Sequence, residues 1–428
     1  MDFATFPRMQ LKLVSLLGLA VFVALAWACS LNRKKFPWRT VVSGLALQFV
    51  FALLILKTTP GALVFDLASR AVNKFISFAE AGAKMVFGPL ANSTLLAEAF
   101  GQDNVFLFAI TVTSTIILVS SVSSLLYHYG ILQQVVRAVA WVMQRVMRTS
   151  GSESLATAAN IFMGQTEAPL VIKPYLARMT RSELLAMMVA GMATIAGGVL
   201  AAYVALGVSA GHLDMAGHLL TASVMNAPAA LLMAKVMLPE TEFSETAAGA
   251  SAQVPCDSIN GLDALCVGAS DGMKLAINVM AMLIAFVAVV AFANYLLAFP
   301  QQKFGVADPV TLQTVFGWVN APFAWLMGVP AKDCQLIGQV LGERVVLNEF
   351  IGYLSLTKQV GDMDSRSFTL ATYALCGFAN FTSIAIQIGG IGALVPGRRT
   401  DLAQLGLRAM VGGLLACYLT ATIVGLLL

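Results

Sequence analysis

Eight long apolar stretches constrain the fold of this chain more than any other feature of its sequence. Each is close to or longer than the roughly 20 residues that an α-helix needs to cross a bilayer. They comprise residues 11–30, 40–57, 104–129, 184–210, 216–238, 274–299, 367–392 and 403–428. Because a segment in lipid must satisfy its backbone hydrogen bonds internally, these stretches predict eight transmembrane helices and an all-α polytopic membrane protein.

The composition supports the same class. Only 11% of the 428 residues are charged and 58% are hydrophobic, whereas soluble domains are about 25% charged. So few cations exclude a nucleic-acid-binding protein, which needs many Lys and Arg side chains on phosphates. The six cysteines and three histidines are scattered without metal-ligand spacing, and no nucleophile is paired with a base. We therefore expect neither an enzyme nor an organic cofactor, and no nucleic-acid partner.

Basic residues are concentrated in four short segments. These are Arg33, Lys34, Lys35 and Arg39; Arg137, Arg145 and Arg148; Lys173, Arg178 and Arg181; and Arg398 with Arg399. Short loops rich in Lys and Arg mark the cytoplasmic side. All four segments share one side if both termini lie outside and two segments enter the membrane without crossing it. We expect a multi-pass protein of the inner membrane, in contact with lipid, with both termini on the outer, periplasmic side.

Three other segments complete the organisation. Residues 61–87 and 131–148 combine apolar and charged residues at helical spacing, which predicts amphipathic helices that lie at the membrane interface. Residues 239–262 are rich in acidic and small residues. They predict an exposed linker that divides the chain into two halves.

The segment from Glu153 to Met179 is too polar for a single spanning helix. Two half-helices, at about residues 153–162 and 168–178, would each reach about halfway into the hydrocarbon core and meet at Gly164–Thr166. Non-helical backbone at that depth is tolerated only inside protein or beside a water-filled cavity. The segment therefore predicts a first re-entrant hairpin.

A second broken segment runs from Val310 to Leu356. Its apolar run, Val315–Met327, ends at Gly328-Val329-Pro330, and the run that follows is interrupted by charged and amide side chains. These are Lys332, Asp333, Glu343, Arg344, Asn348 and Glu349. A re-entrant hairpin fits here too, although its arms are longer than those of the first.

The two halves match in order, because each hairpin is followed by a helix with a polar middle and then by a further helix. An odd number of crossings separates the hairpins, so the second repeat would be inverted. Paired broken helices at corresponding positions mark the midplane substrate site of secondary transporters. The residues alone therefore predict an inverted-repeat transporter with sites at Gly164–Glu167 and Asn348–Glu349.

Four motifs along the chain resemble those of the concentrative nucleoside transporters. They are Gly164-Gln165-Thr166-Glu167-Ala168-Pro169, the segment Gly342–Phe350 with Arg344 and Asn348-Glu349-Phe350, the segment Gly377–Ser383, and Ile388–Leu394 before Arg398-Arg399. The resemblance runs from about residue 10 to the C-terminus. It implies a homotrimer whose uptake of nucleosides such as uridine is coupled to an inward gradient of sodium.

The resemblance also implies a fixed scaffold and a moving transport domain. The scaffold would comprise residues 1–148 and 263–300, and the transport domain residues 149–238 and 301–428, with the linker 239–262 between the halves. The implied substrate residues are Gln165, Thr166 and Glu167 for the base, Val199 as an apolar wall, Glu349, Asn380 and Ser383 for the ribose, and Phe378 nearby. The implied sodium ligands are the side chains of Asn160, Thr166 and Thr194 and the backbone carbonyls of Met163 and Ile195.

The sequence departs from the family pattern at several positions. Arg344 stands where Lys is usual, Gly352 where Ala is usual, Thr382 and Thr194 where Ser is usual, and Gly397 where Asn is common. Thr194 retains the hydroxyl that sodium would need.

Three alternatives remain open. The coupling ion could be a proton, with Glu349 or Glu167 titrating, or the solute could be another small polar molecule carried by the same architecture. Either carboxylate could instead serve a structural ion pair, with Lys173 or Arg344 as partner.

Overall fold

The computed structural model describes residues 8–101, 107–247, 249–250, 258–306, 308–359, 361 and 363–428. Those residues form helices and turns but no strand, which confirms the all-α prediction. Part of the expected linker, and the first three residues of the expected span 104–129, lie outside the described residues.

Seven stretches within the described residues are long and apolar enough to cross a membrane. Six are the helices α1 (Arg8–Ala28), α2 (Trp38–Lys57), α5 (Phe108–His128), α11 (Met215–Met237), α12 (Gly261–Lys303) and α18 (Arg399–Leu427), and the seventh joins α9 (Arg181–Ala193) to α10 (Gly197–Ser209). The expected eighth span, 367–392, is not continuous. It consists of α16 (Ser365–Leu375) and α17 (Phe381–Leu394), which are separately too short to cross.

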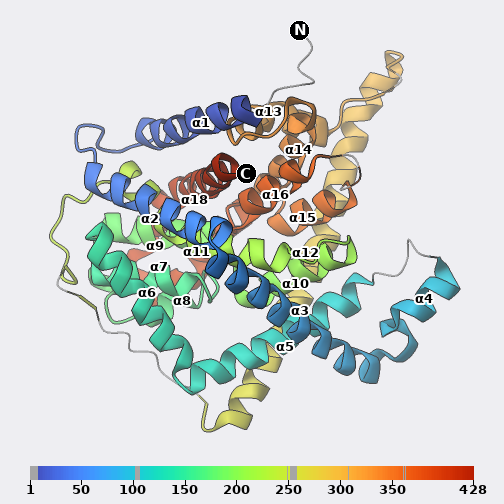
Figure 1. The fold of residues 1–428 in the computed structure, drawn as a ribbon, viewed down its shortest axis with the longest axis horizontal. Coiled ribbons are helices and arrows are strands. Elements are labelled where there is room, and N and C mark those ends of the chain that lie inside the picture. Colours follow the sequence, from blue (N-terminus) through green and yellow to red (C-terminus); the bar gives the residue numbers. More distant parts are fainter. Residues whose placement is uncertain are drawn as a thin grey trace.

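Burial separates inner from outer helices. Within the most apolar 18-residue stretch of each helix, 89% of the residues are buried in α11 and only 11% in α12. The stretch that contains α18 is also mostly buried (78%), and α18 lies among other helices in Figure 1, whereas α12 passes from the lower edge to the upper right and extends beyond its neighbours at both ends. With 43 residues and a rise of about 1.5 Å per residue, α12 is about twice as long as the hydrocarbon core is thick.

The two amphipathic segments are helical, as predicted. Residues 61–87 lie in α3 (Thr59–Phe87), which begins with the side chain of Thr58 accepting from the backbone N–H of Gly61. Residues 131–147 form α6 (Ile131–Met147), whose buried residues Val136, Ala140, Met143 and Met147 recur at helical spacing on one face. Their position at a membrane surface stays a prediction.

The first broken segment begins with α7 (Gly151–Asn160) and continues through a non-helical tip, residues 161–167, into α8 (Ala168–Val171). A capping box between Ser150 and Glu153 starts α7. The expected second arm, 168–178, is not one half-helix. It divides into α8, a turn, and the 3-10 helix η3 (Leu176–Arg178).

The second broken segment contains two turns rather than one. The expected turn at Gly328–Pro330 joins α13 (Leu312–Leu326) to α14 (Cys334–Val346), and these helices pack side by side. A further break at Leu347–Asn348 then separates α14 from α15 (Glu349–Lys358). Asn348 causes that break, because its side chain caps α15 by accepting from the backbone N–H of Ile351 at 3.0 Å.

The chain therefore repeats one order of elements in its two halves. A broken pair, α7–α8 or α14–α15, precedes a second broken pair, α9–α10 or α16–α17, and a long buried helix, α11 or α18, follows. This order of elements is consistent with two matching halves, but it pairs α7–α8 with α14–α15 rather than with the expected hairpin at Gly328–Pro330. The re-entrant hairpins and the inverted orientation of the halves stay predictions.

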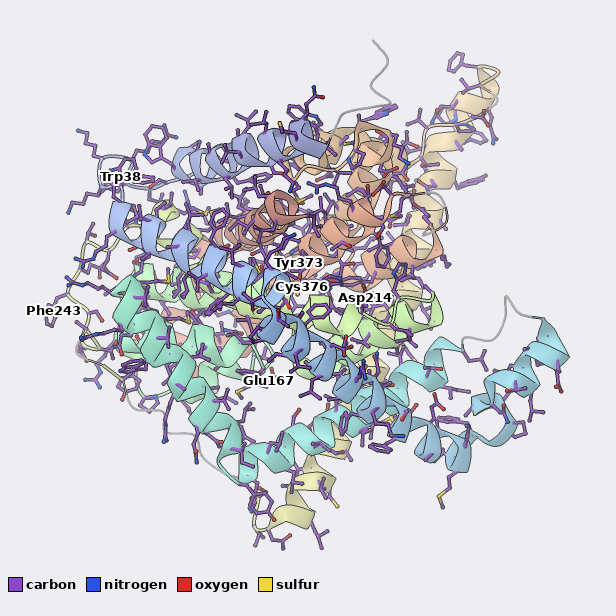
Figure 2. The ribbon with its side chains drawn as sticks, in the orientation of Figure 1. Trp38, Glu167, Asp214, Phe243, Tyr373 and Cys376 are labelled. Carbon is purple, nitrogen blue, oxygen red and sulfur yellow. The ribbon has the colours of Figure 1, made fainter. Side chains whose placement is uncertain are left out.

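The two inner breaks, Thr194–Ala196 and Cys376–Asn380, cross each other at close range. A Cβ atom on Gly377 would lie 2.7 Å from the carbonyl oxygens of both Met192 and Ala193, so only glycine fits. Asn226 of α11 joins the two breaks, because its Nδ2 donates to the carbonyl oxygens of Ala193 at 2.7 Å and Cys376 at 2.6 Å. Figure 2 shows Cys376 in the middle of the molecule.

Candidate substrate and cation site

Glu349 is the first residue of α15, and its side chain is 6% exposed. Asn380 donates through Nδ2 to Oε2 of Glu349 at 2.9 Å. The hydroxyl of Tyr203, in α10, donates to Oε1 at 2.7 Å. Both oxygens of this buried carboxylate therefore accept from protein donors, an arrangement that suits its ionised form.

Gln165 lies at the tip of the first broken segment and faces α17. Its Nε2 donates to Oγ of Ser383 at 3.2 Å, and its Oε1 accepts from Nε2 of Gln387 at 3.1 Å. The side chains of Gln165, Ser383 and Gln387 are all buried. The tip is thus held to α17 by hydrogen bonds between residues more than 200 positions apart.

Asn380 connects these two groups. It caps α17, with its Oδ1 accepting from the backbone N–H of Ser383 at 2.8 Å. The connected residues, which we call the polar network, are Tyr203, Glu349, Asn380, Ser383, Gln165 and Gln387. Four of the predicted substrate residues therefore meet in one place, although they come from three separate breaks in the helices.

Glu167 occupies a different environment from Glu349. It is exposed, and it accepts from the hydroxyl of Thr166 at 3.1 Å. A Cβ atom on Gly164 would lie 2.1 Å from Oε2 of Glu167, so a larger residue there would require the Glu167 carboxylate to move. The structure places Thr166 and Glu167 beside Gln165 on the tip, where Figure 2 labels Glu167, but no hydrogen bond joins Glu167 to the polar network among the described residues.

Neither carboxylate forms the structural ion pair that the sequence left open. Arg344 is fully buried and donates to the carbonyl oxygen of Ala374 and, at 3.2 Å, to Sγ of Cys417. In the part of the chain that the structure describes, no direct ion pair joins Arg344 to Glu349 or Lys173 to Glu167. Arg344 instead stabilises the carboxyl end of α16, where a positive charge is favourable.

The two expected apolar contacts lie at the breaks. Val199 is in the first turn of α10 and 5% exposed. Phe378 lies in the break between α16 and α17 and is half-buried. Both positions are compatible with the roles that the family resemblance implies, and those roles stay predictions.

The expected sodium ligands belong to two adjacent segments. The backbone N–H of Gly197 donates to the carbonyl of Phe162 at 3.3 Å, which brings the tip with Met163 next to the break with Thr194 and Ile195. Thr194 and Asn160 are each 1% exposed, and Thr194 donates to the carbonyl of Ala190 at 2.8 Å.

Asn160 supplies the most informative atom of this group. Its Nδ2 donates to the carbonyl of Ala156 at 3.0 Å, while its Oδ1 is buried and has no hydrogen-bond partner among the described residues. An unsatisfied buried acceptor costs about 1–3 kcal/mol. A cation that prefers oxygen ligands would remove that cost, so the donor set fits a sodium ion.

Tyr203, Gln387 and Asn226 were not anticipated from the sequence. Gln387 offered a signal, because an amide within the apolar run 384–394 must find a partner inside the protein. Asn226 offered the same signal in α11. Tyr203 offered none, because a tyrosine in an apolar helix is usually a core residue.

Comparison with known proteins gives consistent matches over the chain. Residues 17–90 match the N-terminus of Na⁺-dependent nucleoside transporters, residues 109–210 match a nucleoside recognition domain named Gate, and residues 218–425 match the C-terminus of Na⁺-dependent nucleoside transporters. An uncharacterized transporter of Haemophilus influenzae is 42% identical, over 97% of both chains.

Animal relatives and solved structures match similarly. Sodium/nucleoside cotransporter 1 of Homo sapiens is 39% identical over 97% of this chain, which spans only 64% of that protein. The structure of CNTnw in an inward-facing, substrate-bound state aligns with a TM-score of 0.90 at 38% identity, over 97% of each chain. A variant of CNTnw in an outward-facing state aligns with a TM-score of 0.91, over 98% of each chain.

Proposed function

Because this chain belongs to the concentrative, Na⁺-dependent nucleoside transporter family, we propose that it imports nucleosides together with sodium. Members of the family are transporters and not enzymes. The observation that carries the proposal is the polar network, which gathers carboxylate, amide and hydroxyl groups inside an otherwise apolar protein.

The chemistry of a nucleoside matches that of the network. A nucleoside is neutral, and it presents ribose hydroxyls together with the donors and acceptors of its base. Each of these groups must exchange water for a protein partner or lose affinity. In our proposal Glu349 and Asn380 bind the ribose with Ser383, and Gln165, Thr166 and Glu167 bind the base. Val199 and Phe378 would supply apolar contacts.

Sodium would bind beside the base site. Its proposed ligands are Asn160, Thr166 and Thr194 through side chains, and Met163 and Ile195 through backbone carbonyls. The unpartnered Oδ1 of Asn160 supports this set. Thr166 is adjacent to Gln165, so sodium at the tip would order the residues that bind the base. One charge carried inward would gain about 2.3 kcal/mol per 100 mV of membrane potential.

Sodium is favoured over a proton by the surroundings of Glu349. Both of its oxygens already accept hydrogen bonds, from Tyr203 and Asn380. Two such donors suit an ionised carboxylate, which can only accept. Sodium, rather than a proton on Glu349, is therefore the coupling ion that we propose.

The proposed transport cycle is alternating access. CNTnw has been solved in inward-facing and outward-facing states and in intermediate states. By analogy, residues 149–238 and 301–428 would form an inverted-repeat transport domain with re-entrant hairpins, moving against a scaffold of residues 1–148 and 263–300. The assembly would be a homotrimer in the inner membrane, with both termini outside.

Uptake into proteoliposomes tests the proposal. The purified protein should accumulate labelled uridine when an inward sodium gradient is imposed, and much less when choline replaces sodium. Equal uptake in choline that is stimulated by an inward proton gradient would overturn sodium coupling. No saturable uptake of any nucleoside would overturn the function.

A further inference from the structure

Gln387 has no role in the proposed function so far, yet it is fully buried at the end of the polar network. Its Nε2 donates two hydrogen bonds, one to the backbone carbonyl of Met188 in α9 at 3.0 Å and one to Oε1 of Gln165 at 3.1 Å. Its Oε1 is buried and has no hydrogen-bond partner within the described ranges.

The carbonyl of Met188 fixes the direction of this amide. A carbonyl oxygen can only accept, so the amide nitrogen of Gln387, and not its oxygen, must face it. The second hydrogen on the same nitrogen then points to Gln165, which can meet it only with its own oxygen. Gln165 is therefore oriented with Oε1 toward Gln387 and with Nε2 toward Ser383.

The packing of α9 leaves space for this arrangement only because residue 191 is glycine. A Cβ atom on Gly191 would lie 2.8 Å from Nε2 of Gln387 and 3.0 Å from Cβ of Gln165. The two amides thus lie directly against the helix whose carbonyl orients them.

The orientation continues into Ser383. Its Oγ accepts from Gln165, and the cap of α17 uses its backbone N–H rather than its hydroxyl. The hydroxyl proton of Ser383 is therefore free to be donated to a ligand, and so is the second N–H of Gln165. This end of the polar network presents donors.

The opposite end presents acceptors. Tyr203 and Asn380 both donate to Glu349, so the lone pairs that remain on this carboxylate can only accept. Tyr203 is in turn fixed by Tyr353, since the two rings stack with centroids 4.5 Å apart. The network thus has a direction, with donors near Gln165 and acceptors at Glu349.

We propose that Gln387 and Tyr203 are positioning residues that set this direction and so determine specificity. The site would take a ligand with an acceptor, such as a base carbonyl, toward Gln165, and with hydroxyl donors toward Glu349. This inference rests on the proposed nucleoside transport. It assigns recognition of the base to Gln387, acting through Gln165, and recognition of the ribose to Tyr203, acting through Glu349.

The test uses uptake competition by two pairs of nucleosides. The first pair, uridine and 4-deoxyuridine, differs in the C4 carbonyl of the base and the N3–H beside it. The second pair, uridine and 3′-deoxyuridine, differs in a ribose hydroxyl. For each pair, the ratio of inhibition constants is measured in the wild type, Gln387→Met and Tyr203→Phe. Because each ratio is taken within one protein, a general loss of transport rate does not affect it.

Gln387→Met keeps the length of the side chain but releases the amide of Gln165. We expect the base-carbonyl ratio to fall by about tenfold, with the ribose ratio within about twofold of wild type. Tyr203→Phe should reverse this pattern. Gln387→Asn, which cannot span from Met188 to Gln165, is the second variant if the first does not fold, with the same expectation.

The possible failures are distinguishable. If the wild type does not transport uridine, the proposed function falls and this inference with it. If uridine is transported but both ratios remain unchanged in the Gln387 variants, or both fall together, only the inference is overturned. A parallel change of both ratios would indicate a general role in packing.

Discussion

Asn380 donates a hydrogen bond to Oε2 of Glu349 at 2.9 Å while its own Oδ1 caps α17. One side chain therefore starts a helix and orients the buried carboxylate of the candidate site. Any substitution at this position acts on both functions, unless the replacement is itself a good cap.

Asn380→Asp separates the two functions. Aspartate caps helices about as well as asparagine, but it would place a second carboxylate against Glu349, where like charges repel. We expect the variant to fold as a membrane protein and to lose uridine uptake by at least about tenfold, equivalent to about 1.4 kcal/mol. Asn92→Asp, at the half-buried cap of α4 (Ser93–Phe100) and outside the polar network, should retain normal uptake. Equal uptake by both variants would contradict the role of Asn380.

Asn160→Leu tests the proposed sodium ligand. A ligand that binds only the folded protein stabilises it by about 2.7 kcal/mol at 100 times its dissociation constant. The melting temperature of the wild type should therefore rise when sodium chloride replaces choline chloride, and that of Asn160→Leu should not. Thr157→Val, which removes a buried hydroxyl of α7 that likewise has no hydrogen-bond partner among the described residues, should retain the sodium response. A sodium-dependent shift in Asn160→Leu would remove this residue from the ligand set.

Gly377→Ala tests the crossing of the two inner breaks. The added Cβ would lie 2.7 Å from two backbone carbonyl oxygens, which cannot move aside as a side chain can. Overpacking of this kind costs about 1–3 kcal/mol, so we expect a lower melting temperature and reduced uptake. Gly389→Ala, where no atom lies within 4 Å of the added Cβ, should be neutral or stabilising. Normal stability of Gly377→Ala would show that the breaks do not cross as described.

Asn226→Leu tests the bridge between the same breaks. The variant removes the amide donor that the carbonyl oxygens of Ala193 and Cys376 share and leaves them only the thiol of Cys417, at 3.5 Å and 3.2 Å. Each lost hydrogen bond contributes about 0.5–1.5 kcal/mol. The melting temperature should fall clearly further than in Ser223→Ala, one turn earlier on α11, where only a 3.7 Å contact with Cys376 is lost. Similar melting temperatures of the two variants would contradict the bridge.

Motifs with polar residues in apolar surroundings made much of the site predictable. Glu349, Asn380 and Gln165 lie in segments whose charged or amide side chains would be costly in a continuous membrane helix, and the structure brings them together. The breaks were harder to predict. Residues 367–392 are apolar enough to suggest one helix, and only the cap at Asn380 with the glycine at 377 interrupts it.

The second broken segment shows why strong local signals can mislead. Gly328 and Pro330 mark a real turn, with φ of 90° at Gly328, but the break that presents Glu349 comes later, at Leu347–Asn348. Asparagine is a common helix cap, but glycine and proline are the stronger local signal for a turn. Gln387 was missed for another reason, because its partner is a backbone carbonyl 199 residues away, which no pattern along the chain reveals.

Glu349 is the proposed acceptor for the ribose, and sodium-driven uridine uptake by Glu349→Gln tests this central role most directly. The substitution retains the shape of the side chain but loses charge-assisted hydrogen bonds, worth about 1.5–3 kcal/mol each. The matched control is Glu343→Gln, since Glu343 in α14 is also 6% exposed and lies outside the polar network. We predict that uptake falls by at least about tenfold in Glu349→Gln and stays near wild type in the control. Normal uptake by Glu349→Gln would contradict the assignment of the site.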